Sequence, residues 1–391
     1  MSGNSRILLN GFLLIALLVI GSLVSASLWG GKSEKLPEFQ TITIQDEMTL
    51  AEFGRQNNVP NPILKKVFAL TSTDDLGKNI NDFGMSREEI KEKTKKALVL
   101  NAEEASKNWF KIPLKFAVWL VFLGLVFALM RKNLITPKTR KLLYLVSVTV
   151  FGIILGSDPS AMGTVKDAIH LYAVEGVIFP PRMIAFTLFL LTVLLANKYI
   201  CSWGCQAGVL QDLIFRLGRN AQDAKGVVRQ YKPSFLLTNS VRVLFLFTFT
   251  IAAVLWGLDI IDPVDPFKIY KPAVLTVSGL AFIAGLLILS LLVYRPWCHF
   301  FCPFGLVGWF VEKISLFKIK LNYETCIACG ACEKACPSTV MGAILRRKRV
   351  IPDCFSCATC IGVCPTGSIS FASGKRSRPP EGHFDRKKKE G

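Results

Sequence analysis

Histidine is nearly absent from the chain: among 391 residues there are 3, His170, His299 and His383. A haem b held by two histidines needs both of them on apolar helices, and no apolar segment of this sequence carries such a pair. No Cys-x2-Cys-His motif occurs, which excludes a c-type haem. A phosphate-binding loop and a nucleophile paired with a base are also absent, so the chain gives no sign of catalysing a reaction alone.

Acidic residues are outnumbered, with 28 Asp and Glu against 47 Lys and Arg, and the chain is 51% hydrophobic with a mean hydropathy of +0.41. Such a composition is too apolar for a soluble globular protein. A bilayer span needs about 20 apolar residues. We predict about six transmembrane helices, of which the two short ones, 142–156 and 243–258, could be re-entrant or shielded by neighbours. The apolar segments lie at 7–29, 113–130, 142–156, 183–200, 243–258 and 273–294.

The distribution of Lys and Arg predicts the orientation of these helices. Loops 131–141 and 201–235 are rich in basic residues, whereas loops 157–182 and 259–272 hold only two each. Basic loops stay on the cytoplasmic side of a membrane. We therefore expect a multi-pass protein of a bacterial-type inner membrane, with both termini in the cytoplasm and residues 30–112 outside it.

Two segments and one residue near a span are interpreted separately. The first apolar segment, 7–29, resembles a signal peptide, but its long apolar core favours an uncleaved anchor. Arg242, close to the start of a span, is expected to reach the cytoplasmic headgroups. The basic tail 373–391 is expected to be solvated and disordered. As binding partners of the basic runs, membrane lipid or an acidic redox protein is favoured over nucleic acid.

Residues 30–112 are predicted to form a small helical domain. Thr49 and Ser86 have the sequence context of helix caps. Two short helices around a turn at 58–62 resemble a helix-turn-helix, which would indicate DNA binding. The extracytoplasmic position argues against nucleic acid and leaves a docking surface or a structural cap as the alternatives.

All 12 cysteines fall into four motifs. Two of the motifs repeat the bacterial ferredoxin pattern C-x2-C-x2-C-x3-C-P, over 326–337 and 354–365. In two-cluster ferredoxins the fourth cysteine of each run binds the other cluster. Zinc ribbons use two pairs with a longer gap, so the spacing favours iron–sulfur over zinc. We predict two [4Fe–4S] clusters, one bound by Cys326, Cys329, Cys332 and Cys364 and the other by Cys354, Cys357, Cys360 and Cys336.

The remaining cysteines form two C-x3-C pairs, Cys201 with Cys205 and Cys298 with Cys302, each just after an apolar segment. Their similar surroundings indicate an internal duplication, and the predicted topology places both at the cytoplasmic boundary. Residues four apart share a helix face, so the pairs could meet in one four-thiolate site for a further iron or iron–sulfur centre. Each pair could instead cycle between dithiol and disulfide, or be buried and inert.

These patterns predict an α-helical integral membrane protein with a C-terminal α+β domain of the bacterial two-cluster ferredoxin type. The ferredoxin-like domain then lies in the cytosol, where thiols stay reduced. The expected divisions are a first transmembrane helix at 1–29, an extracytoplasmic domain at 30–112, a membrane domain at 113–318, a ferredoxin-like domain at 319–372 and a tail at 373–391.

The segments KYICSWGC at 198–205 and RPWCHFFCP at 295–303, followed by two ferredoxin runs, resemble the polyferredoxin-type membrane proteins. This group includes NapH of periplasmic nitrate reduction, the C-terminal half of NosR and the CcoG-type oxidase assembly proteins. The resemblance covers residues 113–366 and implies quinol-linked electron transfer, with clusters on the cytoplasmic side. Gln206 departs from the family pattern, which often has Pro there. The covalent flavin of NosR-like proteins is not implied, because the chain lacks a Ser-Gly-Ala-Thr type attachment site.

A quinone site is harder to place. His170 and Asp167 on an outer loop are candidates, because a histidine with a pKa of about 6.5 can accept quinol protons. They could also be ordinary solvated loop residues. An outer site would lie a bilayer away from the clusters, which favours a quinone site near the C-x3-C pairs or a bridging partner. Other ionisable groups on the outer loops are Asp158, Glu175, Asp259, Asp262 and Asp265.

We expect the chain to pass electrons between the quinone pool and a partner oxidoreductase, as an electron-transfer subunit of the quinol dehydrogenase type. The alternative is an assembly or maturation factor that reduces a metal or a thiol for a respiratory enzyme, which the CcoG resemblance and the dithiol-like pairs favour. A redox-sensing regulator of the membrane is a third reading, and the sequence offers little for it.

Overall fold

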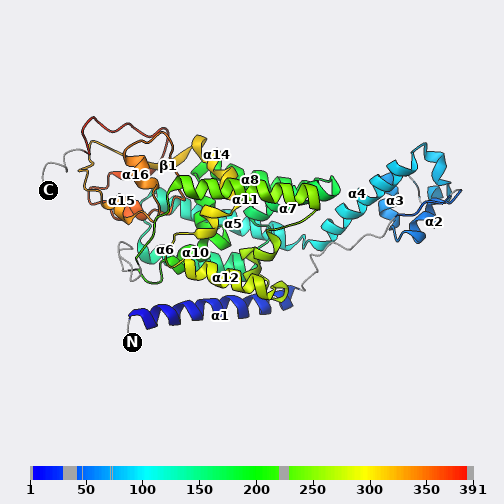
Figure 1. Cartoon of the computed structure of the whole chain (residues 1–391), viewed down its shortest axis with the longest axis horizontal. Helices are drawn as coiled ribbons and strands as arrows, with labels where there is room; N and C mark the ends of the chain where they lie inside the picture. The colour runs from blue at the N-terminus through cyan, green and yellow to red at the C-terminus, as the bar shows by residue number, and fades with distance from the viewer. Residues whose placement is uncertain are drawn as a thin grey trace.

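A computed structural model of the protein describes residues 3–29, 42–45, 47–70, 72, 74–219 and 229–384. The molecule is elongated, with a small helical unit at one end and the cysteine-rich C-terminal domain at the other (Figure 1). Long apolar helices connect these two ends. The start of the first described helix and the last described residues lie toward the end of the molecule that carries the cysteine-rich domain.

Helices make up most of the protein, and only two strands are present in the described ranges. The N-terminal part contains α1 (Gly3–Trp29), α2 (Leu50–Gln56), α3 (Asn61–Phe68) and α4 (Arg87–Ser106). The apolar part contains α5 (Lys111–Arg131), α6 (Pro137–Ser147), the π-helical segment η3 (Val148–Ile154), α7 (Ala161–Glu175), α8 (Pro180–Ala196), α9 (Tyr199–Trp203), α10 (Gln206–Phe215), α11 (Phe235–Trp256), α12 (Val277–Leu289), α13 (Pro296–Phe300) and α14 (Pro303–Val311). The C-terminal domain contains β1 (Phe317–Leu321), α15 (Ala331–Ala335), α16 (Val340–Leu345), α17 (Thr359–Gly362) and β2 (Ile369–Ser373).

Three of the described helices are long and apolar enough to cross a membrane: Leu9–Trp29 within α1, α5 and α11. Their outward side chains, such as Leu13, Val121 and Leu244, are exposed. Exposed apolar surface of this extent fits lipid contact. The helices α8 and α12 are equally apolar but shorter. The protein thus has three candidate spans by length and composition, and the count of six stays a prediction.

The apolar segment 142–156 does not form one straight helix. It divides into the end of α6 and the π-helical segment η3. Within η3, a Cβ on Gly152 would lie 2.3 Å from a ring carbon of Tyr270. The aromatic ring therefore packs directly on the backbone, and only glycine leaves room for it. This short apolar segment packs closely against its neighbours, in agreement with the prediction that neighbouring helices could shield it.

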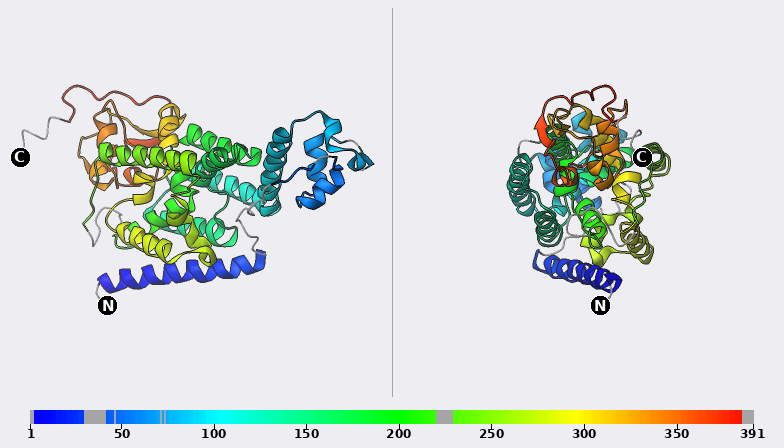
Figure 2. Two further views of the ribbon diagram at one scale, coloured as in Figure 1. Left: turned by 45° about the vertical axis from the view of Figure 1, so that its right-hand side comes forward. Right: turned by 90° about the vertical axis from the view of Figure 1, so that its left-hand side faces the viewer.

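The helix α1 lies at the periphery of the apolar part, as the end-on view shows (Figure 2). Its Ser25 Oγ donates to the carbonyl of Ile154 at 3.0 Å, and its Trp29 Nε1 donates to the same carbonyl at 2.8 Å. A Cβ on Gly21 would lie 2.9 Å from Ile153, so the two segments are in close contact. The uncleaved anchor stays a prediction.

The helical unit at the other end has its own small core. Thr49 and Glu52 form a capping box at the start of α2, and Ser86 accepts the backbone N–H of Glu89 at the start of α4. Both predicted caps are confirmed. The core joins Leu50 and Phe53 of α2 to Leu64 of α3 and to Ile80 and Ile90.

In the C-terminal domain, β1 and β2 form an antiparallel pair in which Phe317 lies opposite Ser373 and Leu321 opposite Ile369. The pair closes the segment that contains all the ferredoxin-run cysteines. It also packs against α5, where Phe127 contacts Phe317 and Phe371 at ring centroid distances of 5.0 and 5.5 Å. The domain is therefore anchored to an apolar helix by aromatic packing.

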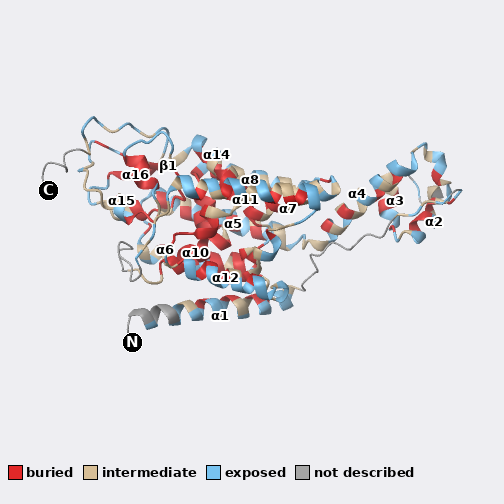
Figure 3. Cartoon of the chain, viewed as in Figure 1, coloured by how far each residue is buried: buried red, intermediate tan, exposed pale blue. Residues whose placement is uncertain are grey.

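The apolar part contains the same arrangement twice. A long helix, a five-residue helix and a second helix follow one another as α8–α9–α10 and again as α12–α13–α14. Every residue of α10 is buried (Figure 3). A wholly buried helix with the polar residues Gln211 and Asp212 requires internal partners for both. Gln211 accepts the backbone N–H of Trp297 and donates to the carbonyl of Ala207. Asp212 pairs with Arg216 and Arg295.

The tail differs in part from the expectation of disorder. Arg376 Nε donates to the carbonyl of Ile319 at 2.9 Å, and the rings of His383 and Phe384 pack against Tyr323. These contacts hold residues up to 384 on the C-terminal domain. The last residues, 385–391, and Lys225 of the predicted basic loop lie outside the described residues.

The close contact at Gly152 gives a stability test. We expect Gly152→Ala to lower the free energy of unfolding by about 1–3 kcal/mol, because the new methyl group overlaps the Tyr270 ring. The measurement is the apparent melting temperature of the detergent-solubilised protein. Gly124→Ala in α5 is the matched control, since a Cβ there meets nothing within 4 Å. Equal melting temperatures for the two variants would contradict the packing.

Candidate iron–sulfur sites

Two cavities in the C-terminal domain are each lined by four cysteines. The first, of about 330 Å³, is the distal cavity, and the second, of about 400 Å³, is the proximal cavity. Each draws three cysteines from one run and the fourth from the other run, as the two-cluster ferredoxin rule requires. All 12 cysteines are free thiols in the structure. The distal cavity holds Cys326, Cys329, Cys332 and Cys364, and the proximal cavity holds Cys336, Cys354, Cys357 and Cys360.

The two cysteine loops wrap around their cavities with the same backbone geometry. The first loop has positive φ at Ala328 (53°) and Gly330 (69°), and the second at Ser356 (50°) and Ala358 (60°). These are matching positions between successive cysteines. Left-handed residues turn the backbone sharply, which lets neighbouring thiols face one point. Three of these four residues are not glycine, so their left-handed backbone is strained. Both loops keep this conformation, which indicates that it is needed to bring the thiols together.

The donor sets fit [4Fe–4S] clusters better than single ions. Within the described ranges, no three His, Cys, Asp or Glu side chains converge closely enough to hold one metal ion. Zinc bonds of about 2.3 Å would require that convergence, whereas a cluster keeps its four thiolates apart. Hydroxyl groups also lie near the sulfurs, with Thr359 Oγ1 3.3 Å from Cys357 Sγ and Thr366 Oγ1 3.7 Å from Cys364 Sγ. Hydrogen bonds to sulfur adjust the potential of such clusters.

The two cavities differ in their exposure to solvent. The proximal thiols of Cys354 and Cys360 are buried, whereas Cys326 and Cys364 of the distal cavity are half-buried. Burial raises the pKa of the free Cys354 thiol to about 12. Cys364, where hydrogen bonds from Thr366 outweigh its burial, has a lowered pKa. The distal cavity is therefore the one that faces outward from the protein.

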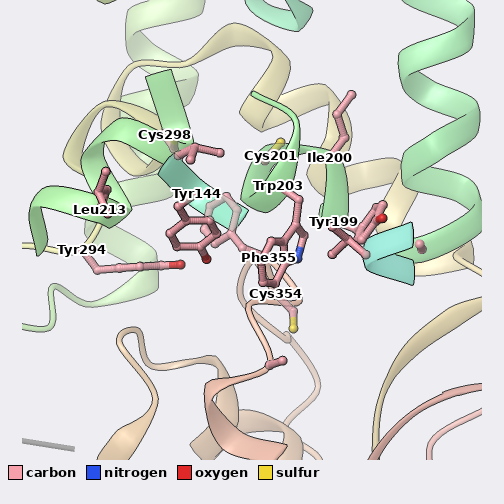
Figure 4. Packing of buried hydrophobic residues seen from close by; sticks show 14 of the residues in the cluster. Tyr144, Tyr199, Ile200, Cys201, Trp203, Leu213, Tyr294, Cys298, Cys354 and Phe355 are labelled. Atoms are coloured by element: carbon pink, nitrogen blue, oxygen red, sulfur yellow. The ribbon is translucent and has the colours of Figure 1, made fainter. Parts of the chain in front are cut away.

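The proximal cysteine loop is docked onto the apolar part. Phe355, directly after Cys354, is buried between that loop and the helices that carry Cys201 and Cys298 (Figure 4). Its ring lies 5.2 Å from the His299 ring. Two further hydrogen bonds of 3.2 Å join the same surfaces, from Trp203 Nε1 to the carbonyl of Ser356 and from Arg216 Nη2 to Thr359 Oγ1.

A buried ionic contact fixes the start of this loop. Asp353 pairs with Lys198 and with Arg242, whose Nη2 lies 2.6 Å from Oδ2 of Asp353, and all three side chains are fully buried. Burial alone would raise the pKa of Asp353, but the two cations outweigh it and hold that pKa well below its usual range. The expectation that Arg242 reaches the headgroups was wrong, because Asp353 holds its guanidinium inside the protein.

The C-x3-C pairs occupy equivalent places in the two copies of the repeat. Cys201 and Cys298 lie on α9 and α13, and Cys205 and Cys302 are the N-cap residues directly before α10 and α14. Cys302 Sγ accepts the backbone N–H of Gly305 at 3.3 Å. Each thiol interacts electrostatically with other members of the set. The structure therefore gathers the two pairs at the contact between the copies.

Each copy also reaches into the other through a cation placed before its first cysteine. Arg295 Nη1 donates to the carbonyl of Cys201 at 2.5 Å, and Lys198 Nζ donates to the carbonyl of Gly305. Arg295 Nη2 also contacts Asp212 Oδ2 at 2.6 Å. Sequence reasoning did not single out these cations or Asp353 as functional, although both cations begin the quoted motifs.

The candidates His170 and Asp167 lie on the helix α7 and not in a loop. Asp167 pairs with Lys166 at 3.1 Å and with Arg182 at 3.7 Å. His170 Nε2 lies 3.2 Å from the carbonyl of Gly257. Neither residue lines the cavity that adjoins Cys205, described next, and their role in quinone binding stays a prediction.

A mainly apolar cavity of about 330 Å³ adjoins Cys205. Lys115 reaches its edge from α5 and donates to the carbonyls of Gly156 at 2.8 Å and Asp158 at 3.0 Å. A lysine inside an apolar helix was a signal that the sequence offered, since such residues mark functional positions in membranes. The walls include Phe116, Trp119, Phe189, Ile200 and Gln206.

The cysteine cavities and the apolar helices define an iron–sulfur protein with helices long enough to span a membrane. A family model described as "4Fe-4S binding domain" matches residues 178–225 and again 275–322, and a second model of that description matches 319–339. The double match falls on the two copies of the repeat. It supports the internal duplication that the similar cysteine pairs suggest.

Among curated proteins, the "Putative electron transport protein YccM" of Escherichia coli (strain K12) is 31% identical over 203 residues. That match covers 49% of this chain and 56% of the E. coli protein, so the chain spans just over half of that relative. The "Uncharacterized protein MJ0749" of Methanocaldococcus jannaschii is 25% identical over 273 residues, covering 68% of this chain and 97% of that protein. No solved structure matches the chain significantly. The matches support an iron–sulfur electron-transport protein.

The exchange of the fourth cysteine can be tested by counting iron. We expect Cys326→Ser and the double variant Cys326→Ser/Cys364→Ser to lose the same amount, about four irons per chain, because both residues line the distal cavity. The double variant Cys326→Ser/Cys336→Ser should lose about eight, because it removes one cysteine from each cavity. The measurement is iron per chain in anaerobically purified protein. The reverse order of the two double variants would show that each run holds its own cluster.

Proposed function

We propose that this chain is an integral membrane iron–sulfur protein that passes electrons between the quinone pool and a partner oxidoreductase. The observation that carries the proposal is the order of the cysteine sites. The C-x3-C pairs lie inside the apolar part, the proximal cavity is docked onto them, and the distal cavity faces outward. Iron–sulfur clusters held at these sites would supply single-electron transfer.

The protein's own residues keep this order fixed. Phe355, Trp203 and Arg216 join the proximal loop to the apolar part, and they exclude water from the contact. Fixed spacing and the exclusion of water between redox sites favour electron transfer between them over side reactions with solvent. The exposed Ile327 beside the distal cavity leaves that side open to a redox partner.

The proposed topology has six spans in a bacterial-type inner membrane, with both termini and the cysteine-rich domain in the cytoplasm. The start of α1 and the last described residues lie toward that domain, and the small helical unit lies at the far end (Figure 1). An even number of spans places both termini on the same side of the membrane. The helices α8 and α12 are short, and they would cross the membrane with their ends shielded from lipid by neighbouring helices.

The quinol part of the proposal rests on the cavity beside Cys205. Aromatic side chains form much of its wall, as is typical of small-molecule sites. It adjoins one of the C-x3-C cysteines directly. A ring bound there would lie next to the redox site without a bridging cofactor, which an outer site at His170 would need.

The proposed function is tested by reducing the purified protein anaerobically with a short-chain quinol. We expect the same electron paramagnetic resonance signals of reduced [4Fe–4S] clusters as after dithionite treatment. Absence of these signals under both reductants would overturn the iron–sulfur assignment. Reduction by dithionite but not by quinol, with a partner oxidoreductase present, would overturn the quinol part alone.

Lys115 gives a site-specific test of the cavity. We expect Lys115→Met to slow quinol-driven reduction by on the order of tenfold or more, because the loop at Gly156 and Asp158 loses the ammonium that positions it. Iron content and dithionite-reduced signals should stay unchanged. Lys111→Met, one turn earlier and stacked on Trp29, is the control and should keep the normal rate. Equal rates in the two variants would contradict a quinol site at this cavity.

A further inference from the structure

Two buried ionic triads surround the C-x3-C pairs, and each contains two cations and one carboxylate. All six side chains are 1% exposed or less. Each carboxylate is ion-paired with two cations, and Nη2 of Arg242 and Nη2 of Arg295 each lie 2.6 Å from an oxygen of their carboxylate. Each triad therefore carries one positive charge in excess. The first triad is Lys198–Asp353–Arg242, and the second is Arg295–Asp212–Arg216.

The excess charge is directed at the cysteine pairs. Nη1 of Arg242 lies 3.1 Å from the point that a Cβ on Gly305 would occupy, and Nη1 of Arg295 lies 3.3 Å from that point on Gly208. Both glycines sit three residues after the second cysteine of a pair. The two guanidinium groups thus hold equivalent positions against the two halves of the repeat.

Parts of both guanidinium groups lack partners. Among the described residues, Nε and Nη1 of Arg242 and Nε of Arg295 are buried without a hydrogen bond. A buried donor without an acceptor is costly, and more so when it is charged. Every thiol of the two pairs is within electrostatic range of one of the cations. Arg295 acts on Cys201, Cys205 and Cys298, and Lys198 and Arg242 act on Cys302.

These observations separate the three readings of the C-x3-C pairs. Neutral buried thiols and disulfides carry no charge, so either would leave both triads unbalanced. Four thiolates on an oxidised [4Fe–4S] or [2Fe–2S] core carry about two net negative charges. That charge equals the excess of the two triads. No site for a single metal ion is found among the described residues.

We infer that Cys201, Cys205, Cys298 and Cys302 bind one iron–sulfur centre as thiolates, shared between the two copies of the repeat, with Arg242 and Arg295 as its counter-cations. The family matches assign each copy to a 4Fe–4S binding domain separately, and Arg242 lies outside both matched ranges. The shared centre adds a site between the apolar cavity and the proximal cavity. It does not depend on quinol being the electron donor.

Sharing is tested by counting iron in the full chain. We expect Cys201→Ser, in the first copy, and Cys298→Ser, in the second, each to lose the same whole centre. The double variant should lose no more iron than either single variant. The ferredoxin-type signals of the distal and proximal cavities should persist in all three, which shows that the protein is folded.

Two results would overturn the shared centre. If neither single variant loses iron, the pairs are thiols or disulfides and hold no metal. If the double variant loses twice the iron of a single variant, each pair holds its own metal. Neither result bears on whether quinol reduces the protein, so failure here is distinguishable from failure of the proposed function.

The counter-cation role is tested by the midpoint potential of the shared centre, identified by its absence in Cys201→Ser. Adding an electron increases the negative charge of the centre, so a nearby cation favours reduction. We expect Arg242→Met to shift the potential to a more negative value, or to lose the centre. Arg242→Lys, which keeps the charge, should retain the iron and restore most of the potential.

Asp353→Asn separates charge compensation from simple anchoring. Both Asp353→Asn and Arg242→Met break the same ion pair, but they remove charges of opposite sign. If Arg242 balances the centre, Asp353→Asn shifts the potential to a more positive value and Arg242→Met to a more negative one. A shift in the same direction for both variants, or a normal potential in Arg242→Met, would overturn the role of Arg242.

Discussion

The structure depends on one buried carboxylate, Asp353, held between Lys198 and Arg242. Lys198 lies between α8 and α9, Arg242 lies on α11, and Asp353 directly precedes the second cysteine run. Removing one partner of a buried pair leaves an uncompensated charge and typically costs about 3–5 kcal/mol. The contact therefore resists separation of the C-terminal domain from the apolar part. It places the proximal cysteines at a fixed position against the C-x3-C pairs.

The duplication explains how so many charges can be buried near those pairs. Each copy provides a cation three residues before its first cysteine and a glycine three residues after its second. Arg295 contacts the backbone of the first copy, and Lys198 contacts the backbone of the second. Each copy thus completes the surroundings of the other. A single copy would leave its cation and its helical glycine without their partners, so the site exists only where the two copies meet.

Predictions that rest on local chemistry agreed with the structure, whereas Arg242, the tail and the segment 142–156 differed because they depend on distant contacts. Caps at Thr49 and Ser86 were predictable because a capping side chain contacts the backbone within three residues. Arg242 was misread because its partner lies far along the chain. The tail was expected to be disordered from its charge, yet Phe384 packs on Tyr323, a contact that composition does not indicate. The division of 142–156 depended on the ring of Tyr270.

The sequence by itself determined the number of cysteine sites, their spacing and the apolar character of the helices that carry them. Spacing is local, so the ferredoxin rule grouped the eight C-terminal cysteines into the same two sets that line the two cavities. Only the tertiary structure decided that the two C-x3-C pairs meet, and that the proximal loop docks on them. The physical reason is that buried charges must find partners, and Lys198, Arg242 and Asp353 find theirs across segments that no periodicity connects.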